Sequence, residues 1–203
     1  EGDEARVVPF EFAGVRSANV TYGHRLAGRE AIPVRDLKYY LNKLRDHLVE
    51  PDPALRRERV ISRSKALLEE WNWVTDEFLE SWVVNSTEWP VPLLGSFDPR
   101  YLELPREVLV SVMRDHQKYF AVEDRSGNLQ PHFVAVLNVE DKGLIRQGHE
   151  RVLAARFADA QFFWKADQQV PLRERTPLLE RVTYHERLGT YADKVERMKD
   201  LSS

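Results

Sequence analysis

Two β-rich runs joined by a polar connection constrain the fold of this 203-residue chain more than any other feature of its sequence. The runs are Tyr119 to Glu123 and Phe133 to Val139, and the connection contains Ser126 to Asn128. Val, Phe and Tyr favour extended backbone, whereas Gly and Asn favour turns. The pattern predicts an antiparallel hairpin whose loop is longer than two residues.

Helical periodicity precedes this hairpin. After Pro33, apolar residues recur at alternating three- and four-residue steps and mark one helix face, which we expect to pack on a sheet. These residues are Val34, Leu37, Leu41, Leu44 and Leu48. Asp52 followed by Pro53 predicts the N-cap and first turn of a second helix that runs to about Asn72. A third helix is expected to begin near Thr75.

The remaining elements follow from the same rules. Two prolines exclude a helix from Trp89 to Phe97 and predict a short or edge strand there. Pro105 is expected to open a helix, and the alanine-rich stretch Gly148 to Trp164 to form another. Its final aromatics, Phe162 to Trp164, are expected in the core. The other predictions are two short strands within Arg6 to Leu26 and helical segments from Pro171 to about Val182 and from Tyr191 to Leu201.

Together these elements predict an α+β fold in which a mixed or antiparallel sheet packs with helices. We assign residues 1–168 to this module and residues 169–203 to a helical extension. The chain begins at Glu1 without a methionine and stops at Ser203, just after a charged helical stretch. We therefore expect it to be an internal segment of a longer protein, with the extension leading to a further domain.

Composition excludes several classes of protein. The chain has no cysteine, so neither a disulfide framework nor a thiolate metal site is available, which suits the cytosol. No apolar run approaches the roughly 18 to 20 residues that cross a bilayer. The start also lacks the basic-then-apolar order of a signal peptide. We expect no membrane role.

The charge balance excludes a global basic field. Lys and Arg number 30 against 33 Asp and Glu, for a formal net charge of −3, so any contact with nucleic acid depends on a local patch. One candidate lies between Lys142 and Arg156, where Arg146 and Arg151 add positive charge and Glu150 is the only acid. Charge alone favours the alternative, which is a solvated helix face.

Motifs for a self-contained active site are missing. No two of the six histidines stand at the spacing, with a carboxylate, that a helix-borne zinc site requires. There is no glycine-rich phosphate loop and no Gly-x-Ser-x-Gly elbow. His24 follows Gly23 and has two readings, contact with a ligand phosphate or a solvent-satisfied turn, of which the turn is favoured. The five tryptophans are expected mainly in the core.

One helix end gathers several functional side chains within Met113 to Phe120. Asp115 and His116 suggest an acid–base pair, although sequence neighbours point in different directions on a helix. Arg114, Lys118 and the adjacent Tyr119 suggest a phosphate contact with a stacked base. The alternative is that the basic residues interact with the negative end of the helix.

Seven sequence blocks follow one another in a recognisable order, namely Tyr22 to Arg25, Leu104 to Leu109, Met113 to Phe120, Pro131 to Val136, Gly148 to Leu153, Ala158 to Phe163 and Leu188 to Val195. In this order the blocks resemble the β subunit of bacterial glycyl-tRNA synthetase, over essentially the whole chain. One departure is His149, where we expect this family to favour Asn.

The resemblance implies a two-component α2β2 enzyme. Its α subunits activate glycine with ATP and Mg²⁺, and its β subunits mainly bind and position tRNA(Gly). This segment is then similar to the editing-type domain of the phenylalanyl-tRNA synthetase β subunit, followed by the lead-in to an HD-type domain. The HD residues are expected downstream, because neither Asp46-His47 nor Asp115-His116 matches that motif.

Three hypotheses follow for the segment itself, which we expect to be cytoplasmic, without a metal or cofactor of its own, and not to bind DNA. In the first, it holds the acceptor arm of tRNA without catalysing a reaction. The candidate RNA-binding residues are Arg114, Lys118, Arg146, Arg151 and Arg156. In the second, it is a scaffold that joins β-subunit domains or docks the α subunit. The third, an editing hydrolase around Asp115 and His116, ranks last because a glycine site excludes larger side chains sterically.

Overall fold

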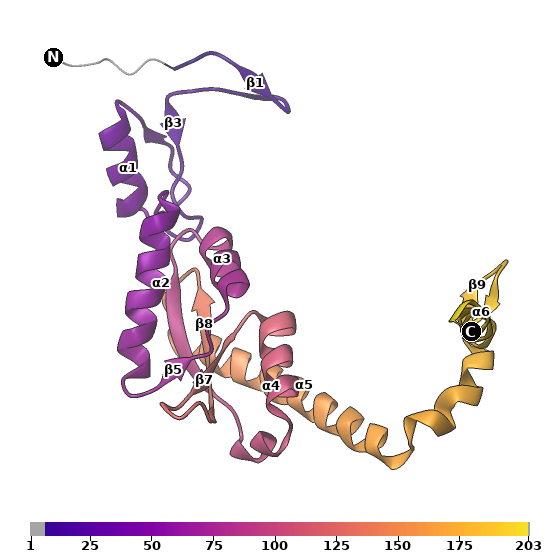
Figure 1. The fold of residues 1–203 in the computed structure, drawn as a ribbon. Coiled ribbons are helices and arrows are strands. Elements are labelled where there is room, and N and C mark those ends of the chain that lie inside the picture. Colours follow the sequence, from indigo (N-terminus) through magenta and orange to yellow (C-terminus); the bar gives the residue numbers. More distant parts are fainter. Residues whose placement is uncertain (1–6, 203) are drawn as a thin grey trace. The chain divides into compact units, whose positions relative to one another are not determined.

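The computed structural model describes residues 7–202 and divides into two compact units, the first ending at Phe157 and the second beginning at Ala158 (Figure 1). Arg6, the first residue of the predicted N-terminal strand region, lies outside the described residues. The long helix α5 runs from Leu144 to Gln169 and so passes through both this division and the predicted boundary at residue 168.

A four-stranded antiparallel sheet forms the centre of the first unit, in the order β5-β7-β8-β6. Its strands are β5 (Asn72–Trp73), β6 (Val91–Ser96), β7 (Phe120–Glu123) and β8 (Leu129–Leu137). The β7–β8 pair confirms the predicted hairpin. The prediction of an edge strand is also confirmed, because β6, which carries Pro92, ends the sheet order and among residues 7–202 pairs with β8 alone.

Two helices with aspartate N-caps contribute to the core beside this sheet (Figure 1). Asp52 accepts a 2.8 Å hydrogen bond from Ala54 N at the start of α2 (Pro53–Leu68). Asp76 accepts one of 2.8 Å from Leu79 N at the start of α3 (Glu77–Ser86). The cluster that they form with the strands consists of Val60, Leu68, Leu79, Val83, Val84, Phe120, Val122 and Val134. The α+β prediction is confirmed.

The helix after Pro105 begins as predicted but changes its hydrogen bonding. Regular α4 covers Arg106–Ser111, and a π-helical turn, η2, continues over Val112–Gln117. Lys118 then adopts the left-handed conformation, with φ of 59°, and ends the turn. This abrupt reversal allows β7 to begin at Phe120, two residues later.

The first half of α5 packs through aromatic contacts. The Phe157 ring packs edge-on against Phe97, with 4.9 Å between ring centroids. Its centroid lies 5.5 Å from that of Tyr101 in the short helix η1 (Pro99–Glu103). Leu153 is buried one turn earlier. Glu150 Oε1 accepts hydrogen bonds from Ser96 N at 2.9 Å and Ser96 Oγ at 3.1 Å, which ties the helix to the end of β6.

The N-terminal region contains more strands than the sequence predicted. β1 (Glu11–Phe12) pairs with β2 (Val15–Arg16), and β3 (Val20–Thr21) pairs with β4 (Ile32–Pro33). Pro33 therefore belongs to a strand and does not open a helix. Helix α1 (Leu37–Asp46) begins only after Asp36, whose carboxylate accepts a 2.7 Å hydrogen bond from Tyr39 N.

The second unit has no buried side chain among its described residues. After the end of α5 it contains η3 (Leu172–Arg181), the β9–β10 hairpin (Thr183–His185 with Gly189–Thr190) and α6 (Tyr191–Ser202). The prediction that Phe162 to Trp164 are core is wrong, since their exposed fractions are 66%, 62% and 38%. Three consecutive helical positions cover roughly 200° of the circumference, so one packed face cannot bury them all.

Candidate nucleic-acid interface

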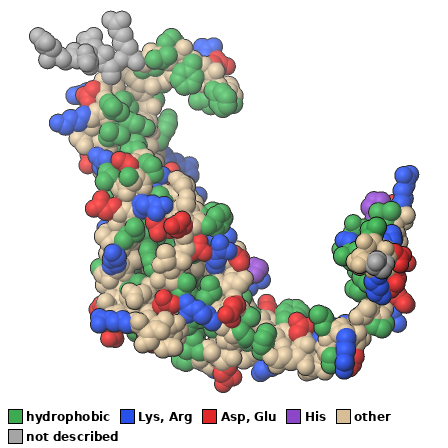
Figure 2. Space-filling model, viewed as in Figure 1, with side chains coloured by type: hydrophobic (Ala, Val, Ile, Leu, Met, Phe, Trp, Pro, Cys, Tyr) green, Lys and Arg blue, Asp and Glu red, His purple; other side chains and the backbone are tan. Residues whose placement is uncertain are grey.

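The five predicted RNA-binding residues fall into two separate groups. Arg114 lies on η2 and Lys118 directly follows it, whereas Arg146, Arg151 and Arg156 lie on α5. In the face shown in Figure 2, basic and acidic side chains are interspersed over the first unit, in keeping with the net charge of −3. Local pairing therefore decides which cations are available to a ligand.

Arg114 and Lys118 both contact neighbouring protein groups. The Arg114 guanidinium forms an ion pair with Asp76, and its Nη1 lies 3.0 Å from Asp115 Oδ1. Lys118 Nζ donates a 3.1 Å hydrogen bond to the carbonyl oxygen of Asp115, but it has no carboxylate partner in the described part of the chain. The Lys118 contact fits the predicted helix-end role, whereas Arg114 pairs with carboxylates, and RNA contact by either residue stays a prediction.

Tyr119 does not offer a ring for stacking a base. Its side chain is buried, it stacks on Phe133 with 4.6 Å between ring centroids, and its hydroxyl is hydrogen-bonded to Nδ1 of His149. Burial raises the pKa of Tyr119 to about 12. The sequence interpretation of Tyr119 as a stacking residue is therefore wrong, because its ring is buried against Phe133 of β8.

Two aromatic side chains on α3 are exposed instead. Phe78 and Trp82 have exposed fractions of 61% and 44%, and they stand four residues apart on one side of the helix. Arg114 Cζ lies 5.6 Å from the Phe78 ring centre, and Lys118 Nζ lies 5.7 Å from that of Trp82. We call these two aromatics and two cations the α3 ridge.

The prediction that most tryptophans are core residues is only partly right. Trp71 and Trp73 are half-buried against the core, and Trp89 is half-buried beneath the Arg59 guanidinium at 3.8 Å. Trp82 and Trp164 are exposed. A usable signal for Trp82 was its spacing from Phe78, which places both opposite the apolar stripe of α3.

The three arginines of α5 are exposed and have no ion-pair partner among residues 7–202. Glu150, the acid expected to balance them, is hydrogen-bonded to Ser96. However, five-residue steps place successive arginines about 140° apart around the helix. Arg146, Arg151 and Arg156 consequently do not share one face, so a single straight backbone cannot follow all three.

The other predicted functional side chains have structural partners. His24 is buried, not solvent-satisfied, and its Nε2 lies 3.0 Å from Asn138 Nδ2. Asp115 Oδ2 accepts a 2.9 Å hydrogen bond from Ser111 Oγ, and within the described residues no hydrogen bond joins Asp115 to His116. The described residues also contain no cluster of three potential metal ligands, and no described helix is long and apolar enough to cross a membrane.

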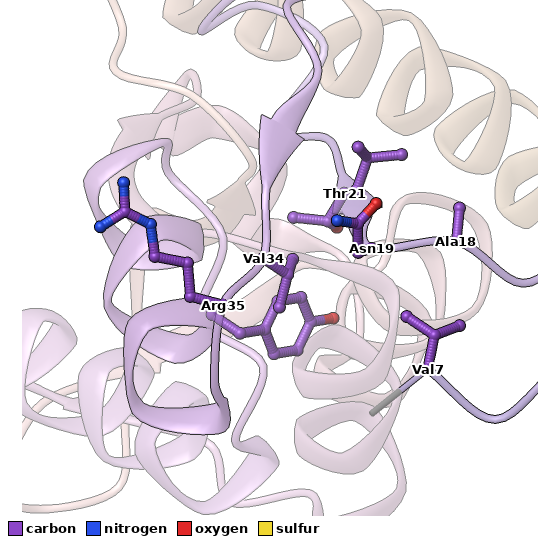
Figure 3. A pocket seen from close by; sticks show the side chains of 8 residues that line it. Val7, Ala18, Asn19, Thr21, Val34 and Arg35 are labelled. Atoms are coloured by element: carbon purple, nitrogen blue, oxygen red, sulfur yellow. The ribbon is translucent and has the colours of Figure 1, made fainter. Parts of the chain in front are cut away.

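An open cavity of 320 Å³ lies beside β3 and α1 (Figure 3). Its walls come from Val7, Ala18, Asn19, Val20, Thr21, Val34, Arg35 and Tyr40. In Figure 3 the Arg35 guanidinium extends away from Val7 and Thr21. The other polar side chains that line the cavity, those of Asn19, Thr21 and Tyr40, carry no charge at neutral pH.

The fold defines a class of protein, an α+β module built on a four-stranded antiparallel sheet. A family model described as glycyl-tRNA synthetase beta subunit matches residues 3–203. The chain belongs to this family, as the resemblance of its sequence blocks indicated.

Curated relatives agree with the family model, and all three named here are glycine–tRNA ligase beta subunits. The chain is 45% identical to that of Acidobacterium capsulatum, 40% to that of Geobacter sulfurreducens and 38% to that of Bacillus subtilis. Each match covers 97% of this chain but 29% of the relative. The chain thus spans less than a third of the length of these relatives.

Proposed function

We propose that this chain is a non-catalytic tRNA-binding part of a glycine–tRNA ligase, which joins glycine to tRNA(Gly) with ATP in the cytoplasm. In this proposal the α subunits of an α2β2 complex hold ATP and Mg²⁺. The chain described here contacts phosphate and sugar groups of the tRNA and so helps to position it, without reading its sequence.

The observation that carries the proposal is that the α5 arginines form no ion pair with a carboxylate in the described structure. Arg151 and Arg156 are exposed, and neither has a carboxylate partner there. An exposed guanidinium that is free of a protein anion can form paired hydrogen bonds with a phosphate. Because the two side chains diverge by about 140°, they suit a curved or branched RNA surface better than one straight strand.

A salt series tests the proposal. The 203-residue chain is titrated with tRNA(Gly) and with an unrelated tRNA at increasing salt. We expect binding that weakens as salt rises. In the double variant Arg151→Ala with Arg156→Ala, the slope of the logarithm of the binding constant against the logarithm of the salt concentration should be smaller by about two. Lys38→Ala, at an exposed lysine on α1, is the control for nonspecific loss of charge. An unchanged affinity and slope in the double variant would refute the α5 contact.

A scaffold role is the second candidate, supported by the exposed apolar side chains of the second unit. Leu172 and Leu201 have exposed fractions of 85% and 88%. Exposed leucines of this kind favour a covering protein surface. Changing both to Ser should release the α subunit in co-sedimentation if they dock it, while tRNA affinity stays unchanged. Retained co-sedimentation would count against docking at these leucines.

A further inference from the structure

The α3 ridge combines two aromatic and two cationic side chains, and the RNA hypotheses drawn from the sequence did not group these four together. On the outer side of α3 the exposed fraction is 61% for Phe78 and 44% for Trp82. Their inner neighbours Leu79 and Val83 are buried at 2% exposure each. Leu79 and Val83 therefore hold α3 against the core. The exposed rings of Phe78 and Trp82 can contact a ligand while the helix stays packed.

The charges around the ridge are not equivalent. Arg114 contacts two carboxylates, those of Asp76 and Asp115, and this pairing offsets its charge. Lys118 is different, since its ammonium contacts only a carbonyl oxygen and, in the part of the chain that the structure describes, no carboxylate. The cation available to an anionic ligand therefore stands beside Trp82, 5.7 Å from its ring centre.

We propose that the α3 ridge binds an unpaired nucleotide of RNA, with its base stacked on Trp82 and its phosphate on Lys118. Phe78 supplies a second stacking surface one helical turn away. Stacking on aromatic side chains is a common way in which proteins bind unpaired bases, and a lysine beside the ring can meet the attached phosphate. The inference rests on the proposed tRNA-binding function and adds a place and a kind of contact to it.

RNA fits this surface better than a purely apolar partner does. A protein partner that covered Phe78 and Trp82 would also cover the Lys118 ammonium, which has no described carboxylate to neutralise it. Burying an unpaired charge is costly. A nucleotide covers the ring and neutralises the ammonium at once, because its base is flat and its phosphate is anionic.

The test uses the complete ligase and a salt series with tRNA(Gly). Trp82→Ala should weaken binding about tenfold at every salt concentration and leave the salt slope unchanged, because stacking releases no counterions. Lys118→Ala should reduce the slope by about one. Trp82→Phe should retain most of the affinity, since it keeps an aromatic ring. Trp164→Ala, at an exposed tryptophan of the second unit, is the matched control and should change nothing.

Each outcome separates this inference from the proposed function. If Arg151→Ala with Arg156→Ala has no effect but Trp82→Ala weakens binding, the α5 contact is wrong and the ridge stands. If the α5 variants weaken binding but Trp82→Ala and Phe78→Ala do not, the ridge proposal is overturned. Unchanged tRNA affinity with loss of the α subunit from the Trp82→Ala ligase would also overturn it and identify a protein-docking surface. Thermal unfolding of each variant checks that the fold is intact.

Discussion

Asp76 and Arg114 connect two elements that are far apart in the sequence. One carboxylate oxygen of Asp76 accepts the Leu79 N–H at 2.8 Å and begins α3, while the other forms an ion pair with the Arg114 guanidinium on η2. Asp76 thereby sets both the start of the helix that carries Phe78 and Trp82 and the position of the turn that carries Arg114. Asp76 therefore contacts both elements that carry the α3 ridge.

Replacing Asp76 with Ala should destabilise the first unit by about 1 to 2 kcal/mol, mostly through loss of the helix cap. The ion pair is partly exposed, so it adds little to that figure. Asp36→Ala is the matched control, because Asp36 caps α1 through Tyr39 N but forms no ion pair in the described structure. Chemical unfolding of both variants checks this, and an Asp76→Ala variant as stable as the parent chain would contradict it.

The acid stability of the fold should also depend on Asp76. Burial opposes ionisation of this carboxyl, but the hydrogen bonds from Leu79 N–H and Arg114 outweigh it and hold its pKa below the ordinary 3.8. An aspartate with a lowered pKa stabilises the fold above its unfolded pKa and loses that contribution as pH falls through the folded value. Unfolding free energies measured from pH 6 downwards should fall less steeply below about pH 4 for Asp76→Asn.

Gly95→Ala should destabilise the sheet through a clash with Phe133. A Cβ at position 95 would lie 2.3 Å from Cζ of the Phe133 ring, its cross-strand partner. That ring is fully buried and stacked on Tyr119, so it cannot swing away. We expect a loss of about 1 to 3 kcal/mol, typical of overpacking. Gly127→Ala is the control without a clash, because its Cβ would meet no atom within 4 Å. Only the backbone strain at φ +84° remains in that variant.

His149→Asn should flatten the pH dependence of stability near neutrality. Burial lowers the pKa of His149 from its ordinary 6.5, and the carboxylate of Asp141 only partly opposes this. The unfolded chain therefore takes up the proton first, and stability is lost as pH falls from 6.5 towards the lower folded pKa. Thermal melts between pH 5 and 8 should show this slope in the parent chain and less of it in the Asn variant. Equal slopes in the two proteins would show that another group is responsible.

Tyr119→Phe should have its effect at the opposite end of the pH range. Burial raises the pKa of Tyr119 from 10.0 to about 12, so the neutral phenol is favoured in the fold. Stability is consequently lost as pH rises from 10 to about 12, because only the unfolded chain ionises there. The Phe variant should lose less stability over that interval in alkaline unfolding curves. A steeper alkaline loss in the variant would contradict the assignment.

The sequence by itself determined several local elements and the family. Asp52 and Asp76 cap helices through backbone groups two or three residues away, so their effect is readable from neighbouring residues. The β7–β8 hairpin likewise depends on adjacent runs and the turn between them. The sequence blocks indicated glycyl-tRNA synthetase β because they need only residue identity and order, not folding.

Only the tertiary structure decided which side chains face a ligand. One sequence hypothesis gave Tyr119 a base-stacking role, and this residue is buried; the tryptophans were expected mainly in the core, and Trp82 is exposed. Residues far along the chain form both environments, since Tyr119 contacts His149 and Lys118 comes to lie near the Trp82 ring. Burial is set by such distant neighbours, and a linear pattern gives the period of an element but not its packing partner. Asp76 and Arg114, 38 residues apart in the sequence, form an ion pair that joins α3 to η2 at the α3 ridge.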